Sequence, residues 1–202
     1  MKLIGTYSSP FVRKVRIVAA EHQLPLEIIE DPPLGHATHI TAVNPLGKVP
    51  VLVRDDGKTL IDSSLICAWL DQRGQGERLL PAAPEESMAV QQAEAIADGI
   101  MDAAVLIRME MLRPEPLRSS AWVERQSNKI QRGIAWLDTQ LARHAFVAGE
   151  SLTLADIAAV CANSYLLFRF ADQAYTAEAM RLEKLCTALE TRASFAATAL
   201  RG

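Results

Sequence analysis

The chain has 202 residues, of which 50% are hydrophobic and 22% charged, and its formal net charge is -3 at pH 7. This length accommodates one large domain or two small ones with a substantial core. The composition fits a soluble globular protein and argues against a nucleic-acid-binding surface. We expect no membrane span, because no apolar stretch is long enough to cross a bilayer. We also expect no signal segment, because "MKLIGTYSSP" turns polar within a few residues, so the predicted location is cytoplasmic.

The N-terminal part of the chain carries both strand and helix signals. Short β-rich runs alternate with segments whose apolar residues fall at helical spacing. Pro10 opens the first of these helices, where a proline is favourable because its missing N–H would have no partner in the first turn. The predicted elements, in chain order, are a strand at 2–7, a helix at 10–22, a strand at 24–30, an irregular connection at 31–45, a strand at 49–53, a hairpin turn at 54–58, a strand at 59–61 and a helix at 62–74.

Beyond residue 78 the pattern becomes helical. The segment "LLPAAPEE", residues 79–86, contains two prolines and no periodicity, which predicts a linker. Apolar residues at helical spacing then predict helices at 84–113, 120–144, 153–171 and 177–200, the last of these as one or two helices. The helix at 153–171 is apolar on nearly all sides, so we expect it at the centre of its domain.

Several residues are interpreted as structural. Thr153 and Asp156 fit the spacing of a capping box, in which each side chain satisfies a backbone N–H at the start of a helix. Cys67, Cys161 and Cys186 are far apart, form no CxxC pair and match no metal-ligand spacing. We therefore predict that they are buried thiols and that the chain holds no metal site.

The junction "YSSPFVRKVR", residues 7–16, raises a question of function. It places two serines at the start of a predicted helix, where backbone N–H groups and the helix dipole attract anions. A serine at this position also serves as an ordinary N-cap. The residues alone leave both interpretations open.

Three segments in order carry a resemblance to a known family. They are "SSPFVRKVR" at 8–16, "NPLGKVPVL" at 44–52 and "LIDSSLICAWL" at 60–70, with "LTLADIAA" at 152–159 as a fourth. With these motifs the whole chain resembles the cytosolic glutathione S-transferases, of the bacterial type with a Ser-Pro-Phe motif. The resemblance implies an α/β thioredoxin-like N-terminal domain at 1–78, a linker at 79–86 and an all-α C-terminal helical domain at 87–202.

The resemblance implies that Ser9 is the catalytic residue. The thiol of glutathione has to ionise, and a free cysteine thiol has a pKa of about 8.5. Lowering this pKa by about 2 units needs about 2.7 kcal/mol of thiolate stabilisation. A charge-assisted hydrogen bond supplies roughly 1.5–3 kcal/mol and a helix N-terminus roughly 0.3–1 kcal/mol, so a serine hydroxyl suffices without a protein base. Ser8 and Tyr7 are the alternatives, and a pure N-cap role for Ser9 also remains open.

The other two motifs imply the glutathione-binding residues. Val49 precedes Pro50, and a cis peptide bond there would let the Val49 backbone pair with glutathione like an added strand. A trans proline at the start of an edge strand is the alternative. Lys48 would reach the glycine carboxylate, or would simply be solvated. Asp62 and Ser63 would bind the γ-glutamyl group at a helix N-terminus, although both also suit helix capping.

For the second substrate the resemblance implies a pocket for a small hydrophobic electrophile. Its candidate residues are Tyr7 and Phe11 beside the first helix, and Met101 and Arg108 on the first long helix. Methionines at this spacing are also typical of a helix core, and Arg108 also suits a solvated face. His36 and His39 lie in the irregular loop and are interpreted as solvated, with glutathione contact left open.

The predicted protein is a glutathione-dependent transferase with a detoxification role, forming a homodimer and using glutathione as co-substrate. The alternatives are a glutathione-dependent peroxidase, disulfide reductase or isomerase, and a non-catalytic binding module of the same fold. A thioredoxin-type oxidoreductase is disfavoured because no cysteine precedes Cys67. The identity of the electrophile is not predicted.

Overall fold

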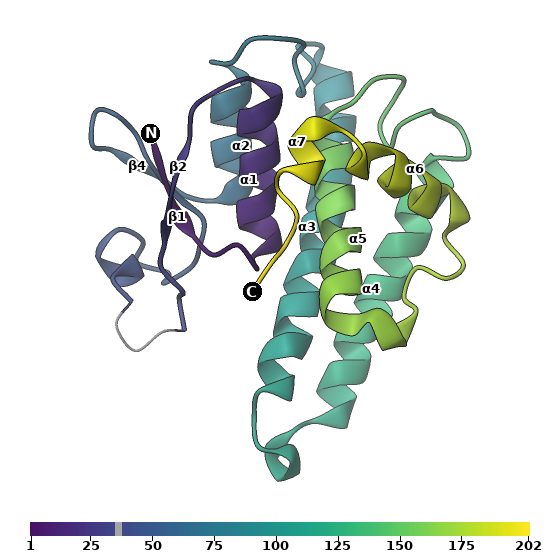
Figure 1. The fold of residues 1–202 in the computed structure, drawn as a ribbon. Coiled ribbons are helices and arrows are strands. Elements are labelled where there is room, and N and C mark those ends of the chain that lie inside the picture. Colours follow the sequence, from purple (N-terminus) through teal and green to yellow (C-terminus); the bar gives the residue numbers. More distant parts are fainter. Residues whose placement is uncertain (35–37) are drawn as a thin grey trace. The chain divides into compact units, whose positions relative to one another are not determined.

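The structure, a computed structural model, describes residues 1–34 and 38–202 and divides into two compact units (Figure 1). The first unit comprises Met1–Leu80 together with Thr191–Gly202, and the second comprises Pro81–Glu190. The predicted combination of a thioredoxin-like α/β part and an all-helical part is confirmed. The residues from Thr191 onward, which the sequence assigns to the helical half, group with the first unit.

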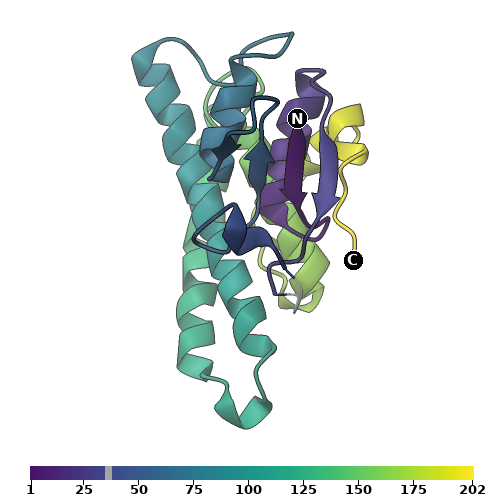
Figure 2. The ribbon, with the colours of Figure 1, turned by 90° about the vertical axis from the view of Figure 1, so that its left-hand side faces the viewer.

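The first unit is built on a four-stranded sheet of order β2-β1-β3-β4, seen with its strands side by side in Figure 2. Strand β1 runs parallel to β2 and antiparallel to β3, and β3 runs antiparallel to β4. Along β1 the side chain of Leu3 is fully buried whereas Lys2 is exposed, as expected for a sheet with one face in the core. The strands are β1 (Lys2–Gly5), β2 (Glu27–Glu30), β3 (Val51–Val53) and β4 (Thr59–Leu60).

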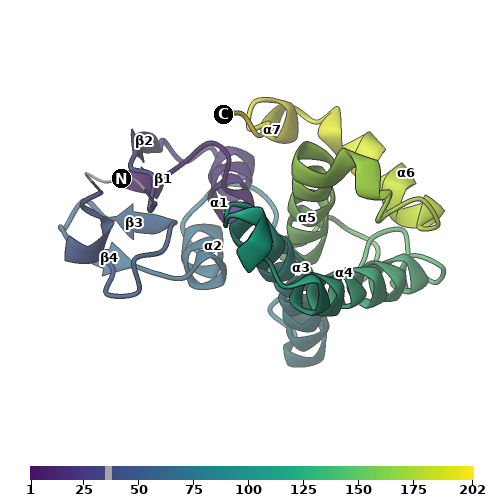
Figure 3. The ribbon, with the colours of Figure 1, turned by 90° about the horizontal axis from the view of Figure 1, so that it is seen from below.

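Two helices, α1 (Pro10–Glu21) and α2 (Ser63–Asp71), cover the same face of this sheet, as Figure 3 shows. The apolar residues predicted at helical spacing in α1 form its buried side, for example Val12 and Val15 at 0% exposure. The connection predicted to be irregular contains a short 3₁₀ turn, η1 (Ile40–Ala42), anchored by the fully buried Ile40.

The helical unit is organised around its long helices. In Figure 1 helices α3 and α4 run side by side, and α3 also packs on α5. The helices are α3 (Pro84–Met111), α4 (Ser120–Gln140), α5 (Leu154–Phe170) and α6 (Met180–Glu190), with short 3₁₀ turns η2 (Glu115–Leu117) and η3 (Ala171–Gln173). The remaining short helix, α7 (Ala193–Ala196), belongs to the first unit.

Helix α5 is the core helix of its unit, as predicted, with most of its side chains buried. The predicted capping box is present at its start. Both the backbone N–H and the hydroxyl of Thr153 donate to Asp156 Oδ2 at 2.8 Å, and the N–H of Val147 donates to Asp156 Oδ1 at 2.7 Å. Asp156 is fully buried, so its oxygens hold the segment before the helix in place rather than face solvent.

The expectation that no stretch is long enough to span a membrane is wrong by length and composition. Among residues 1–34 and 38–202 one segment, Leu154–Gln173, is sufficiently long and apolar. Its 67% burial is typical of a core helix, which passes the same test, so it is weak evidence for a membrane span. The three cysteines are buried as predicted, and none forms a disulfide within the described part of the chain.

The segment from Thr191 to Gly202 runs along α1 and is tied to it at several points. Near the end of α1, Arg192 donates to both carboxylate oxygens of Glu21, at 2.9 and 2.7 Å. In the middle, Arg13 donates to the carbonyl of Phe195 at 3.3 Å, and the Phe195 ring is fully buried. Further on, Arg16 donates to the carbonyl of Thr198 at 3.1 Å. The segment is therefore a structural part of the first unit.

One prediction concerns the ion pair at the end of this segment. The Arg192 hydrogen bond holds the pKa of Glu21 below its usual value. A lowered carboxyl pKa contributes stability above the unfolded-state pKa, and this contribution disappears as the pH falls through the folded-state pKa. Glu21→Gln should therefore cost about 1 kcal/mol of unfolding free energy at neutral pH, a modest value because Arg192 is half exposed. Urea unfolding at several pH values should show the difference shrinking in acid; a constant difference would contradict the assignment.

Candidate functional site

The sheet register brings three loop segments to one end of the sheet. Ile4 pairs with Val51, and Leu52 pairs with Leu60. Because both pairings are antiparallel, the residues that follow β1, precede β3 and follow β4 lie at the same end. These are the three segments that the sequence singles out as motifs, so the fold assembles them in one place.

Ser9 lies at this end as the N-cap of α1. Its backbone is extended (φ -83°, ψ 125°), and its Oγ accepts a hydrogen bond from the N–H of Val12 at 3.3 Å. A hydroxyl has two acceptor lone pairs and one donor proton, and this bond uses only a lone pair. The proton of the half-buried Ser9 hydroxyl is therefore available to a ligand, so the capping and ligand-binding interpretations are compatible.

The alternatives to Ser9 are engaged elsewhere. The guanidinium groups of Arg16 and Arg201 lie 4.9 and 3.9 Å from the centroid of the Tyr7 ring. The backbone carbonyl of Tyr7 also accepts a hydrogen bond from the N–H of Arg201 at 3.3 Å. The Ser8 hydroxyl lies 3.4 Å from that of Thr6. These contacts favour Ser9 as the ligand-facing hydroxyl of the loop.

The Val49–Pro50 peptide bond is cis, which confirms the prediction. Pro50 is buried and Val49 is half-buried. Within residues 1–34 and 38–202 no backbone hydrogen bond uses the N–H or C=O of Val49. Its two peptide groups can therefore pair with an extended peptide ligand in the manner of an added strand.

Asn44 braces the loop in front of Val49, a role that the sequence analysis missed. Its side chain is 2% exposed, donates to the carbonyl of Lys48 at 2.7 Å and accepts from the N–H of Leu46 at 2.9 Å. Gly47 has φ +62°, a left-handed conformation that favours glycine. The Asn-Pro dipeptide is a turn signal that could have identified this brace. The Lys48 side chain is exposed.

Asp62 and Ser63 stand at the N-terminus of α2. Asp62 is its N-cap, because its Oδ1 accepts from the N–H of Ser64 at 2.8 Å. Ser63 is only 2% exposed, and its hydroxyl has no hydrogen-bond partner in the described part of the chain. Buried hydroxyls are normally hydrogen-bonded, so this one is a candidate for pairing with a ligand.

Lys14 adds a positive charge beneath this helix end. It is fully buried in α1, and its ammonium group donates to Ser64 Oγ at 3.1 Å. A cation beside a helix N-terminus strengthens the local attraction for an anion. The sequence analysis did not single out Lys14. Its position between the buried residues Val12 and Val15 is nevertheless unusual for a solvated lysine.

The remaining predicted residues are distributed over both units. Phe11 is half-buried in α1, and Arg108 is half-buried in α3 of the helical unit. Met101 has 0% exposure, so it offers no surface to an electrophile and is a core residue of the helical unit. His39 is exposed, and His36 lies outside the described residues.

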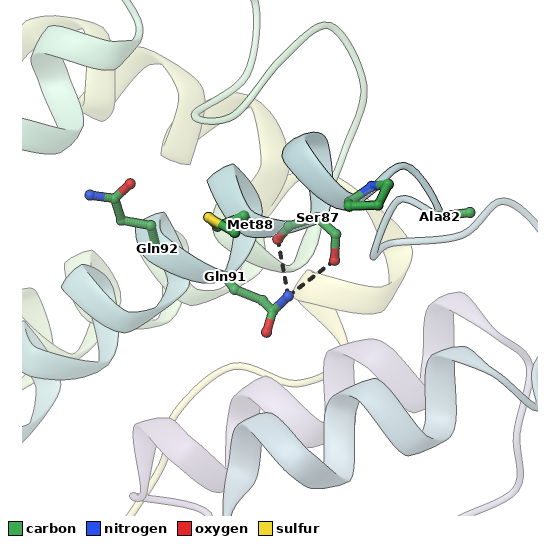
Figure 4. A pocket seen from close by; sticks show the side chains of 6 residues that line it. Ala82, Ser87, Met88, Gln91 and Gln92 are labelled. Atoms are coloured by element: carbon green, nitrogen blue, oxygen red, sulfur yellow. Dashed lines mark hydrogen bonds between the residues drawn. The ribbon is translucent and has the colours of Figure 1, made fainter.

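The helical unit has a surface hollow of about 600 Å³ at the start of α3, drawn in Figure 4. The Gln91 side-chain amide donates to the carbonyl and hydroxyl of Ser87, at 3.2 and 3.0 Å. None of Tyr7, Phe11, Met101 and Arg108 lines the hollow, and none of the described residues that line it is titratable, so we assign it no chemistry. Its lining residues are Ala82, Pro84, Ser87, Met88, Gln91 and Gln92. No group of three metal-ligating side chains occurs among the residues that the structure describes.

A mixed sheet with two helices on one face, followed by an all-helical unit, defines a thioredoxin-like protein with a helical C-terminal domain. Comparison with known families matches residues 3–78 to the glutathione S-transferase N-terminal domain and residues 120–184 to the glutathione S-transferase C-terminal domain. The chain belongs to the glutathione S-transferase family.

The similarity to individual known proteins covers nearly the whole chain. The uncharacterized GST-like protein YibF of Escherichia coli (strain K12) is 38% identical over 198 residues, which are 98% of this chain and 98% of the relative. A glutathione S-transferase of Methylobacillus flagellatus KT, solved with GSH bound, is 38% identical with a TM-score of 0.95 and 99% coverage of both chains. One of Methylobacterium radiotolerans JCM 2831, in complex with glutathione sulfonate, is 38% identical with a TM-score of 0.94, covering 100% of this chain and 95% of the other.

Proposed function

We propose that this protein is a glutathione transferase in which Ser9 stabilises the thiolate of glutathione. The observation that carries the proposal is the placement of Ser9: its hydroxyl caps α1 through a lone pair and keeps its proton for a sulfur at the helix N-terminus. The relative from Methylobacillus flagellatus KT was solved with glutathione bound, which supports the choice of co-substrate.

The rest of glutathione would bind along the same end of the sheet. The peptide groups of Val49 would pair with the cysteinyl backbone, which is supported by the absence of backbone hydrogen bonds to Val49 in the described part of the chain. Ser63 would bind the γ-glutamyl carboxylate, and Asp62 the γ-glutamyl ammonium group. Lys48 would reach the glycine carboxylate from its exposed position.

The proposed reaction transfers the glutathionyl group to carbon. The thiol proton leaves to solvent, since a hydrogen bond and a helix N-terminus stabilise the thiolate without a protein base. The sulfur electron pair then forms a bond to an electrophilic carbon. In a substitution the leaving group departs with its bonding electrons; in an addition to a conjugated alkene the electrons move towards the activating carbonyl, and solvent protonates the adjacent carbon.

The proposal also covers the second substrate and the assembly. In the first unit Phe11 is a candidate residue for the electrophile, with Tyr7 restricted by its two arginine neighbours. In the helical unit Arg108 is a separate candidate. A homodimer is part of the proposal, and the exposed apolar side chains of Leu65 on α2 and Met88 on α3 support it. A cytoplasmic location is also proposed.

The proposal is tested by adding glutathione to the purified full chain in a calorimeter and then assaying thioether formation with 1-chloro-2,4-dinitrobenzene. Binding of glutathione together with enzyme-dependent loss of the chloride supports it. Binding without turnover over a panel of electrophiles would instead favour a binding module. Absence of glutathione binding would overturn the proposal.

Ser63→Ala gives a separate test of the γ-glutamyl site. Because the Ser63 hydroxyl has no partner in the described structure, its removal should leave the free energy of unfolding nearly unchanged. Loss of a hydrogen bond to a carboxylate should weaken glutathione binding by about 1.5–3 kcal/mol, or roughly 10- to 100-fold. Calorimetry and urea unfolding measure the two quantities. Unchanged affinity would remove Ser63 from the site.

A further inference from the structure

A group of polar side chains in the helical unit is not used by the glutathione site. Tyr165 and Arg169 lie on α5, and Arg108 lies on α3, which packs against α5. The guanidinium group of Arg169 lies 4.2 Å from the centroid of the Phe168 ring. Tyr165 and Arg169 are four positions apart on α5, so they share one side of the helix. The Nε of Arg169 is buried and has no hydrogen-bond partner within the described residues.

No ion pair among the described residues balances the positive charge of Arg108 and Arg169. No carboxylate of residues 1–34 and 38–202 forms an ion pair with Arg108 or Arg169, whereas Arg113 of the same unit pairs with Glu110 at 3.1 Å. A guanidinium group that is partly removed from water is normally paired with an anion, because its desolvation is otherwise unfavourable. The guanidinium groups of Arg108 and Arg169 therefore lack a counter-ion among the described residues.

Tyr165 does not supply the missing negative charge. Its side chain is 4% exposed, and burial raises the pKa of its hydroxyl, although Arg169 and Arg108 oppose this shift. The phenol is therefore neutral under physiological conditions and keeps a proton that it can donate. Two guanidinium groups and one neutral hydroxyl are together a set of donors for a small anion.

We propose that Arg108, Tyr165 and Arg169 form a carboxylate-binding site in the helical unit, and that the second substrate of this enzyme carries the carboxylate. The second part rests on the proposed transferase function; the binding site itself does not. A planar guanidinium fork matches a carboxylate with two parallel hydrogen bonds. The aromatic ring of Phe168 and the buried Tyr165 favour a singly charged group on an apolar body over a strongly hydrated polyanion.

Binding is tested without turnover by a matched pair of unreactive probes. Calorimetry on the full chain compares 3,5-dinitrobenzoate with 3,5-dinitrobenzamide, which differ in charge and little in shape. We expect the carboxylate to bind about tenfold more tightly or better, the range for one charge-assisted hydrogen bond. Arg169→Gln and Arg108→Gln should each remove most of this preference, and Arg169→Lys should keep part of it. Arg132→Gln, which alters an exposed arginine on α4, is the matched control and should change nothing.

Equal binding of the two probes to the wild type, or an equal effect of Arg169→Gln on the binding of both, would overturn the site.

Turnover is compared with 4-chloro-3,5-dinitrobenzoate and its amide in the presence of glutathione, as the ratio of their kcat/KM values. A ratio that favours the carboxylate and falls about tenfold in Arg169→Gln supports the assignment to the second substrate. Thioether formation without such a preference overturns that assignment and leaves the transferase function intact. Charge-selective binding without any thioether formation leaves the carboxylate site intact and contradicts the transferase function.

Discussion

Ser9→Ala should raise the pKa of the thiol of bound glutathione by about one to two units, and should slow thioether formation roughly 10- to 100-fold at a pH below both pKa values. The hydroxyl proton that Ser9 keeps in its capping arrangement is the only donor of this side chain, so alanine removes the hydrogen bond while the N–H groups of α1 remain. The thiolate fraction falls tenfold for each unit between the pH and the pKa. Ultraviolet absorbance of the thiolate against pH, with bound glutathione, measures the shift directly.

The control has to separate catalysis from helix capping. Alanine at an N-cap costs about 1 kcal/mol of stability, whereas glycine costs only a few tenths. Ser9→Gly should therefore reproduce the shift in thiol pKa with little loss of stability, and Ser9→Thr should preserve part of the activity because it keeps a hydroxyl. Ser8→Ala should have little effect on the thiol pKa, because the Ser8 hydroxyl lies near that of Thr6.

The outcome that would contradict the assignment is specific. If Ser9→Gly binds glutathione with the same thiol pKa as the wild type, Ser9 is only a helix cap. The N–H groups at the start of α1 would then stabilise the thiolate without it.

Asp71→Asn should lower the free energy of unfolding by about 3–5 kcal/mol, because it leaves buried donors without an acceptor. Asp71 is completely buried at the end of α2 and accepts four hydrogen bonds. Its Oδ1 accepts from His22 Nε2 at 2.9 Å and from the N–H of Leu79 at 2.6 Å; its Oδ2 accepts from Arg78 Nε at 2.7 Å and from the N–H of Leu80 at 3.3 Å. In Asp71→Asn an NH₂ group replaces one carboxylate oxygen. This group cannot accept a hydrogen bond, so it would face the donors that the oxygen accepted from.

The surroundings of His22 leave little room to adapt. Its Nδ1 lies 2.9 Å from the carbonyl oxygen of Gln75, so both ring nitrogens are engaged. A Cβ added at Gly74 would lie 2.0 Å from the Cβ of His22, so this position also admits no larger residue. The cluster therefore fixes the ends of α1 and α2 against the chain that follows them.

Urea unfolding measures this effect, with two controls. Arg78→Gln removes only a half-exposed partner and should cost about 1 kcal/mol or less, and Asp102→Asn, on the exposed side of α3, should cost almost nothing. Since the cluster lies at the opposite ends of α1 and α2 from Ser9 and Ser63, the folded fraction of Asp71→Asn should bind glutathione with unchanged affinity. If Asp71→Asn lowers the free energy of unfolding no more than Arg78→Gln does, Asp71 does not hold the buried cluster together.

The features that the sequence determined by itself are local. Helix starts at Ser9 and Asp62, the capping box of Thr153 and Asp156, and the burial of α5 were predicted because a cap or an apolar periodicity depends on residues only a few positions apart. The cis bond before Pro50 and the two-part fold came from motifs that resemble a family rather than from such patterns. The placement of the chain in the glutathione S-transferase family then followed from comparison with known proteins.

Tertiary structure alone decided which polar residues are buried and what they meet. Lys14 contacts Ser64, fifty positions away, and Asp71 contacts His22, forty-nine positions away, so no local pattern reveals either pair. The last residues return to α1, which brings Arg201 against the Tyr7 ring. The packing of the helical unit makes Met101 a core residue. A buried charge is stable only where the folded chain supplies partners or leaves a place for a ligand, and that condition depends on contacts between distant parts of the sequence.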